Sequence, residues 1–249
     1  MKASQPPAIL LLLILALATT SAQSADPINL GSRLEPLVDR FVIQTLKGKA
    51  RLQLHKPQPR EVVLVHDVPW EGNLTAHHTL FRDGDIYRVY YGGRHYEPGK
   101  QVRHVLISYA ESKDGLRWTR PKLGLYEYEG SKKNNIVWMD DPWAKGEQRN
   151  PMAIFKDSNP RCAPDARYKS VARGDDGVYA LKSPDRIHWS LLSPKRVIPK
   201  GEMGLDSQNL AFWDTLQGRY ICYLRSSHTY PSGERVRDVK TAVSNDFVH

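Results

Sequence analysis

The sequence predicts an all-β protein, a β-propeller in which one sheet unit repeats at least three times. The pattern Ser-x-Asp-x-x-x-Trp starts at Ser112 and again at Ser183, and a copy that stops before its Trp starts at Ser244. These starts are roughly 60 to 70 residues apart, which suits a four-stranded propeller blade with long loops. No long amphipathic helical pattern occurs, and turn residues are frequent, with 17 Gly and 17 Pro. Sheets are therefore favoured over helices.

The first 24 residues have the layout of a secretory signal peptide. Lys2 precedes an apolar run at residues 8–18, and a small, polar stretch follows that run. The run is shorter than the about 20 residues that a membrane helix needs. We expect residues 1–24 to be removed and residues 25–249 to form one propeller domain. The mature protein is then secreted or periplasmic, without membrane attachment; an uncleaved anchor is the alternative.

Two apolar runs separated by a turn precede each copy of the pattern. They occupy residues 79–91, 153–171 and 210–223. Each pair of runs predicts an antiparallel hairpin. The Ser-x-Asp pattern then fits the turn between the third and fourth strands, with its Trp packed between neighbouring sheets. We interpret Asp114, Asp185 and Asp246 as turn residues and not as catalytic groups.

Three copies are too few for a complete propeller, which has about four to eight blades. The third copy stops one residue before its expected Trp. We therefore expect the fold to be incomplete at the C-terminus of this chain. An incomplete propeller would expose one unpaired sheet face.

The formal net charge of +9 is spread along the chain. Lys and Arg residues alternate with acids, and no nucleic-acid-binding motif accompanies them, so we expect no nucleic-acid partner. Cys162 and Cys222 are the two cysteines. An oxidising compartment permits a disulfide between them, but sequence spacing does not decide whether it forms.

Several segments together resemble exported bacterial proteins described as glycosyl hydrolase family 32-like. The segments are residues 112–118, 121–124, 129–131, 134–137, 157–160, 167–169, 206–209 and 212–214. The likeness runs from about Leu37 to the end of the chain. It implies the five-bladed propeller shared by glycoside hydrolase families 32 and 43, with about three blades in this chain. It also implies a carbohydrate partner and hydrolysis of a poly- or oligosaccharide.

The resemblance implies carboxylates at the starts of the innermost strands. Glycoside hydrolysis uses one protonated carboxyl group and one ionised carboxylate. The candidates here are Glu71 before the first hairpin and Asp206 before the third. Before the second hairpin the counterpart is the segment 147–151, with the further candidate Asp141 a little earlier in the sequence. The Asn-Asp-Pro-Asn box and the Glu-Cys pair of family 32 are absent, which puts hydrolysis in doubt.

A sugar site also needs hydrogen-bonding groups and an aromatic platform. The candidates near the strand starts are Trp70, Asn73, His78, Arg149, Asn150, Gln208 and Asn209. His77 and His78 are adjacent, so their side chains are expected to face opposite sides of a strand. We expect no cofactor and no metal site, because no His-x-x-His pair or carboxylate-rich loop of ligand spacing occurs.

A non-catalytic propeller that binds carbohydrate or another partner on the same face is the alternative. Fold is a weak guide to function, so the choice depends on the carboxylates. Two carboxyl groups about 5 to 9.5 Å apart would favour a glycosidase. Dispersed carboxyl groups would favour binding without catalysis.

Overall fold

The computed structural model describes residues 26–31, 35–99, 103–139, 153–201, 205 and 208–249. The chain divides into two compact units, residues 1–59 and residues 60–249. The described part of the first unit contains no helix or strand. All the strands named below belong to the second unit. No helix in the described residues is long and apolar enough to cross a membrane.

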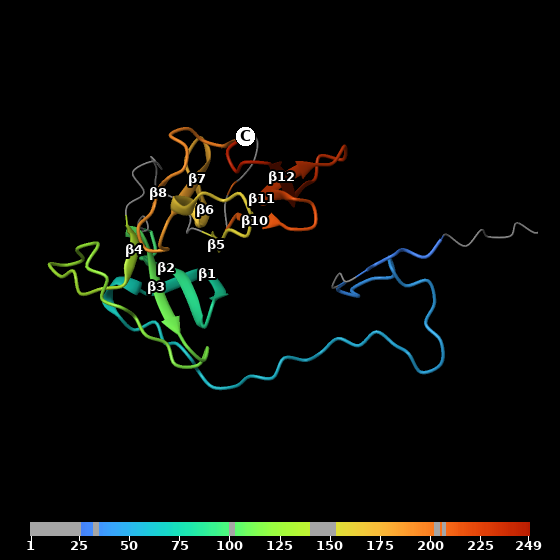
Figure 1. The fold of residues 1–249 in the computed structure, drawn as a ribbon, viewed down its shortest axis with the longest axis horizontal. Coiled ribbons are helices and arrows are strands. Elements are labelled where there is room, and N and C mark those ends of the chain that lie inside the picture. Colours follow the sequence, from blue (N-terminus) through green and yellow to red (C-terminus); the bar gives the residue numbers. More distant parts are fainter. Residues whose placement is uncertain (1–25, 32–34, 100–102, 140–152, 202–204, 206–207) are drawn as a thin grey trace, which may run out of the picture. The chain divides into compact units, whose positions relative to one another are not determined.

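The second unit is all-β, with three antiparallel sheets that follow one another along the chain (Figure 1). The first sheet has the order β1 (Leu74–Asp83), β2 (Ile86–His95), β3 (Arg103–Ser112), β4 (Ile136–Met139). The second has the order β5 (Ala153–Lys156), β6 (Tyr168–Arg173), β7 (Gly177–Ser183), β8 (Ser190–Leu191), with β9 (Ile198–Pro199) also paired to β7. The third has the order β10 (Leu210–Asp214), β11 (Arg219–Thr229), β12 (Arg235–Ser244). Two short 3-10 helices are η1 (Pro69–Glu71) and η2 (Pro164–Ala166).

The three predicted hairpins are confirmed as the pairs β1–β2, β5–β6 and β10–β11. Each hairpin begins its sheet, and apart from β9 the later strands pair in chain order. The first strands also contact one another in sequence, β1 with β5 and β5 with β10. The starts of the three sheets therefore lie together, while the later strands extend away from them.

The Ser-x-Asp pattern forms the same turn three times. In the first copy, Ser112 Oγ accepts the amide of Gly115 at 2.9 Å, and Asp114 Oδ1 accepts the amides of Leu116 and Arg117. The residue after each aspartate has a positive φ, which is 75° at Gly115, 71° at Arg186 and 72° at Phe247. The interpretation of these aspartates as turn residues is confirmed.

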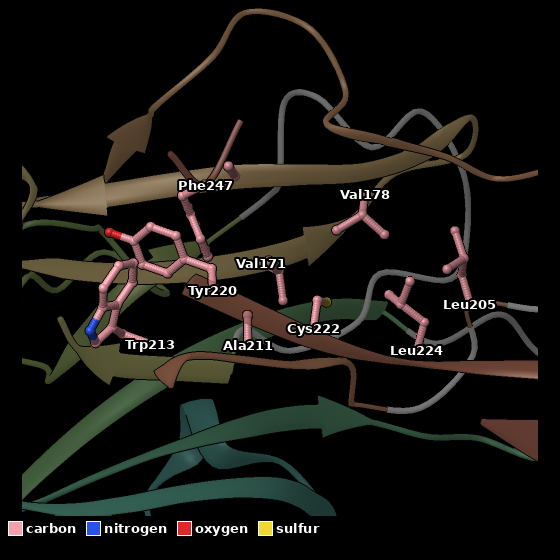
Figure 2. Packing of buried hydrophobic residues seen from close by; sticks show 10 residues of the cluster. Val171, Val178, Leu205, Ala211, Trp213, Tyr220, Cys222, Leu224 and Phe247 are labelled. Atoms are coloured by element: carbon pink, nitrogen blue, oxygen red, sulfur yellow. The ribbon is translucent and has the colours of Figure 1, made fainter. Parts of the chain in front are cut away.

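Apolar side chains fill the space between successive sheets. One cluster joins the first sheet to the second through Tyr90, Ile107, Tyr109, Ile154 and Leu181, with Trp189 packed against it. Figure 2 shows the other cluster, which joins the second sheet to the third. Its members include Val171, Val178, Trp213, Tyr220, Cys222 and Phe247. Buried apolar side chains thus hold the first sheet to the second and the second to the third.

A tyrosine–aspartate contact repeats at both interfaces. Tyr168 of the second sheet donates to Asp83 of the first at 2.7 Å, and Tyr220 of the third donates to Asp157 of the second at 2.6 Å. Each aspartate ends the first strand of its hairpin or directly follows it, and each tyrosine lies at the beginning of the second strand. Both aspartates are buried. We call this pairing the Tyr–Asp contact.

A basic residue of its own sheet accompanies each of these aspartates. Arg88 Nε donates to Asp83 Oδ2 at 2.8 Å, and Lys169 donates to Asp157. Lys156 of the second sheet adds a cross-sheet bond to Asp83 Oδ1 at 2.6 Å. Burial by itself raises the pKa of Asp83, but these donors and Tyr168 outweigh it and hold that pKa well below its usual range.

The two cysteines do not pair. Cys222 is buried in the cluster of Figure 2, and burial raises the pKa of its thiol to about 12. Cys162 lies beside Lys169, whose Nζ is 3.2 Å from its sulfur.

Candidate functional site

The starts of β1 and β10 are joined by a side chain that the sequence singled out. Gln208 Nε2 donates to Thr79 Oγ1 at 2.8 Å and to the carbonyl of His77 at 3.3 Å. The first and third sheets thus meet where sugar-binding groups were expected. Asp141, Arg149, Asn150 and Asp206 lie outside the described residues.

Two glycines bring Glu71 against the first sheet. A Cβ on Gly72 would lie 2.0 Å from the carbonyl oxygen of Arg94, and one on Gly93 would lie 2.9 Å from the Cα of Glu71. Because both positions lack a side chain, η1 lies directly on β2. Glu71 is consequently 0% exposed.

The carboxylate of Glu71 is enclosed by hydrogen-bond donors. Tyr91 donates to Oε1 at 2.6 Å, and Arg120 donates to Oε1 at 2.9 Å and to Oε2 at 3.3 Å. The amide of Val68 also lies 3.3 Å from Oε2. Burial, with the bond to Glu71, raises the pKa of Tyr91 well above its ordinary value. Both oxygens of the Glu71 carboxyl group are thus engaged by the protein.

Trp70 and Asn135 extend this network. Trp70 Nε1 donates to Asn135 Oδ1 at 2.7 Å, and Asn135 Nδ2 donates to the hydroxyl of Tyr91 at 3.1 Å. Trp70 is half-buried, so part of its ring remains at the surface. Trp70 directly precedes Glu71, and the accessible part of its ring can serve as a platform on which a sugar ring stacks.

The histidine pair lies in an irregular part of β1. The pairing register with β2 shifts between Ala76 and Thr79, and His77 has a φ of 57°. His77 Nδ1 lies 3.1 Å from Arg94 Nη2, whereas His78 stacks on Tyr91 with ring centroids 5.7 Å apart. His77 and His78 thus lie in a bulge opposite Tyr91, where the regular alternation of a strand is interrupted, so the expectation that they face opposite sides stays a prediction.

His78 belongs to a chain of three polar groups. His66 Nδ1 is 3.5 Å from Glu71 Oε1, and its Nε2 is 3.0 Å from Nε2 of His78. Burial and the neighbouring His66 lower the pKa of His78. The sequence analysis did not select His66, Tyr91, Arg94 or Arg120: Tyr91 belongs to a repeated hairpin only as an apolar strand residue, and the other three lie in no repeated motif.

The remaining described candidates make contacts within the protein. Asn73 exchanges two 2.8 Å hydrogen bonds with the backbone of Tyr96. Asn209 is buried, and its Oδ1 accepts the amide of Arg225 at 3.2 Å. These two amides hold loops and strands in place, whereas Trp70, His78 and Gln208 are partly accessible.

A separate apolar cavity of about 260 Å³ lies between the second and third sheets. Val171, Ile198, Tyr220, Val243 and Phe247 are among its lining residues, and no carboxylate side chain of the described residues lines it. It is therefore unsuited to glycosidase chemistry. In the part of the chain that the structure describes, no group of three or more His, Cys, Asp or Glu is arranged to hold a metal ion.

Comparison with known proteins shows similarity at the level of the fold. No protein-family model matches this chain, and no curated protein matches it. A solved structure described as a glycoside hydrolase has a TM-score of 0.50 and 15% sequence identity, and the match covers 70% of this chain and 55% of that protein. The chain thus spans about half the length of that structure. It shares the fold of that structure over 70% of its own length.

Two further solved structures are similar at lower scores. One, described as a complex of BT0996 and RGII, has a TM-score of 0.47 and 15% identity, with 70% of this chain and 55% of that protein covered. The other is a glycosyl hydrolase from Bacteroides ovatus, with a TM-score of 0.41, 14% identity, and 70% and 49% of the two proteins covered.

Proposed function

We propose that this protein is a secreted or periplasmic glycoside hydrolase that acts on a poly- or oligosaccharide. The observation that carries the proposal is the fold match with a solved glycoside hydrolase at a TM-score of 0.50. We also propose that the three sheets are consecutive blades of a β-propeller. The successive contacts of β1, β5 and β10 support this, because a propeller gathers one strand of each blade around its axis.

Asp141 and Asp206 are the proposed pair of catalytic carboxyl groups. One would protonate the leaving oxygen, and the other would attack the sugar or activate water. Their segments lead into β5 and β10, and β5 contacts both β1 and β10. Trp70, His78 and Gln208, with Arg149 and Asn150, are the proposed sugar-binding groups, since they combine an aromatic face with several hydrogen-bonding atoms.

Glu71 has a different proposed role from these two aspartates. The Glu71 carboxylate is 0% exposed, and both of its oxygens accept hydrogen bonds from the protein, so a substrate cannot reach it. We assign Glu71 a positioning role, in which it fixes the hydroxyl of Tyr91, whose ring stacks on the accessible His78. A direct catalytic role for Glu71 stays a prediction of the sequence.

The test is turnover of a panel of plant and bacterial oligosaccharides by purified variants of the whole chain. Asp141→Asn and Asp206→Asn are each expected to lower turnover at least about 100-fold with little change in thermal stability. Asp85→Asn is the control, because the side chain of Asp85 is fully exposed. Unchanged turnover in both aspartate variants would reject this pair.

One observation favours a non-catalytic carbohydrate-binding propeller as the second candidate. Glu71, the predicted catalytic carboxylate that the structure describes, is enclosed by protein donors. This candidate predicts that the chain binds one oligosaccharide of the panel, measured by calorimetry, without hydrolysing it. Binding should then weaken in Trp70→Ala and remain unchanged in Asp206→Asn.

A further inference from the structure

Two imidazole rings meet beside Tyr91 of the first sheet. His66 precedes η1 and His78 lies in β1, and their Nε2 atoms are 3.0 Å apart. Both rings contact Tyr91, with ring centroids 4.5 Å away for His66 and 5.7 Å away for His78. Tyr91 is itself wholly buried. A fixed aromatic ring thus supports both histidines.

The separation of the two nitrogen atoms matches that of two ligands of one metal ion. An imidazole nitrogen binds Zn²⁺ at about 2.0 to 2.1 Å. Two such nitrogens lie about 2.9 Å apart when their bonds to the ion form a right angle, and about 3.3 Å apart in a tetrahedral site. The observed 3.0 Å lies between these values. A rotation of the two rings would therefore direct both Nε2 lone pairs at one ion.

The surroundings of His66 favour a lone pair on the atom that would bind the ion. Its Nδ1 is buried and has no hydrogen-bond partner in the described part of the chain. Glu71 Oε1 lies 3.5 Å from this nitrogen, which is too long for a good hydrogen bond but close enough for electrostatic attraction. A proton on Nδ1 is therefore favoured, and Nε2 keeps its lone pair. Metal-binding histidines commonly have a carboxylate beside their other nitrogen.

The local charge and the exposure of the rings favour a cation from solution. Glu71 and Asp67 carry two negative charges, and Arg120, which lies within 3.6 Å of both carboxylates, carries one positive charge. One negative charge of these three groups therefore remains uncompensated. The side chain of His66 is 20% exposed and His78 is exposed, so an ion can reach both rings.

The pair makes an open site and not a closed structural one. No third His, Cys, Asp or Glu of the described residues joins the two histidines in a metal-binding arrangement. A closed zinc site uses four protein ligands, whereas an open site leaves positions for water or an external molecule. The sequence did not reveal the pair, because its members are twelve positions apart. Neighbouring ligands in common zinc motifs are separated by only about two to five residues.

We propose that His66 and His78 bind a divalent first-row transition metal ion through their Nε2 atoms, with water in the remaining positions. Imidazole suits Zn²⁺, Cu²⁺ and Ni²⁺, whereas Ca²⁺ and Mg²⁺ take oxygen ligands. Two protein ligands hold an ion more weakly than the four of a closed site. The proposal concerns metal binding alone and does not depend on the proposed hydrolysis.

Isothermal titration calorimetry of Zn²⁺ into the whole, untagged chain tests the proposal. One equivalent is expected to bind with a dissociation constant of about 10 µM. His66→Ala and His78→Ala should each weaken binding at least about tenfold, because each removes one of the two protein ligands. His55→Ala is the matched control, since His55 is exposed. Circular dichroism shows whether each variant is folded.

Two further measurements separate this site from surface histidines that bind metal ions singly. Cu²⁺ bound to the wild type should show two coordinated nitrogens in its electron paramagnetic resonance spectrum, and each single variant should show one. Saturating Zn²⁺ should raise the melting temperature of the wild type but not that of His66→Ala or His78→Ala, because an ion that binds the folded chain stabilises it.

Three results would each overturn the proposal. They are an absence of Zn²⁺ binding at about 100 µM, binding that both variants leave unchanged, and a single coordinated nitrogen in the Cu²⁺ spectrum of the wild type. None of these measurements uses turnover, so a failure of the proposed hydrolysis is distinguishable from a failure of this site.

Discussion

Arg120 donates hydrogen bonds to both oxygens of Glu71, at 2.9 and 3.3 Å, across 49 positions of sequence. The pair connects the turn after β3 to the 3-10 helix before β1. Glu71 is wholly buried and the Arg120 side chain is 22% exposed. A buried carboxylate of this kind depends on its partner, because removal of one charge leaves the other without compensation.

We predict that Arg120→Met lowers the free energy of unfolding by about 3 to 5 kcal/mol, since it leaves Glu71 buried and unpaired. The double variant Arg120→Met with Glu71→Gln should recover a large part of that loss. Urea denaturation at pH 7 measures both. Arg117→Met is the control, because the Arg117 side chain is 91% exposed. Equal losses in Arg120→Met and Arg117→Met would contradict the prediction.

The Tyr–Asp contacts should hold the sheets together. Tyr168→Phe and Tyr220→Phe each remove one hydrogen bond to a buried carboxylate and are expected to cost about 1.5 to 3 kcal/mol. Chemical denaturation monitored by tryptophan fluorescence gives these values. Tyr230→Phe, at an exposed position, should change stability by less than about 0.5 kcal/mol. If Tyr168→Phe and Tyr220→Phe lost no more stability than Tyr230→Phe, the Tyr–Asp contacts would not hold the sheets together.

Asp83 should make stability depend on acidity. Its folded pKa is depressed, so its contribution to stability is complete above the unfolded value of about 3.9 and is lost as the pH falls below it. At pH 7, Asp83→Asn should destabilise the protein by about 3 kcal/mol, because it removes the buried charge partner of Arg88 and leaves it only the more exposed Glu111. The difference from wild type should shrink at pH 3. A difference that is constant between pH 7 and pH 3 would exclude this linkage.

Gly115→Ala tests the turn geometry. Gly115 has a φ of 75°, and a Cβ there would meet nothing closer than 3.9 Å, so the cost arises from the backbone alone. We expect a loss of about 1 kcal/mol. Lys113→Ala, an exposed substitution in the same turn, should be nearly neutral. Thermal unfolding of the two variants side by side makes the comparison.

The features that the sequence predicted well are local. The hairpins and the Ser-x-Asp turns depend on residues within a few positions of one another, so their patterns are visible in a single sequence. Trp189 packs between the first two sheets, as the repeat suggested, but Trp118 packs on residues of the first sheet alone, where the expectation was wrong. The chain's all-β class followed from the same local signals.

The candidate site was only partly predictable, because its contacts join distant segments. Glu71 was selected for its position before a strand, but its partner Arg120 follows a different strand and belongs to no motif. Asn73 and Asn209 have the residue type of a sugar ligand, yet each is occupied by backbone groups of the protein. Nothing in a single sequence distinguishes an amide that binds a loop from one that binds a ligand.

The charges along the outer edge of β12 bear on which strands can pair with it. β12 pairs with β11 on one side, and on the other it has no neighbouring strand among the described residues. Its exposed side chains include Arg235, Arg237, Asp238 and Lys240. A foreign strand that added to this edge would bring its own backbone against a row of mostly positive charges, which opposes fibril-like growth. High salt would screen those charges, so another strand would pair with this edge more readily in concentrated salt.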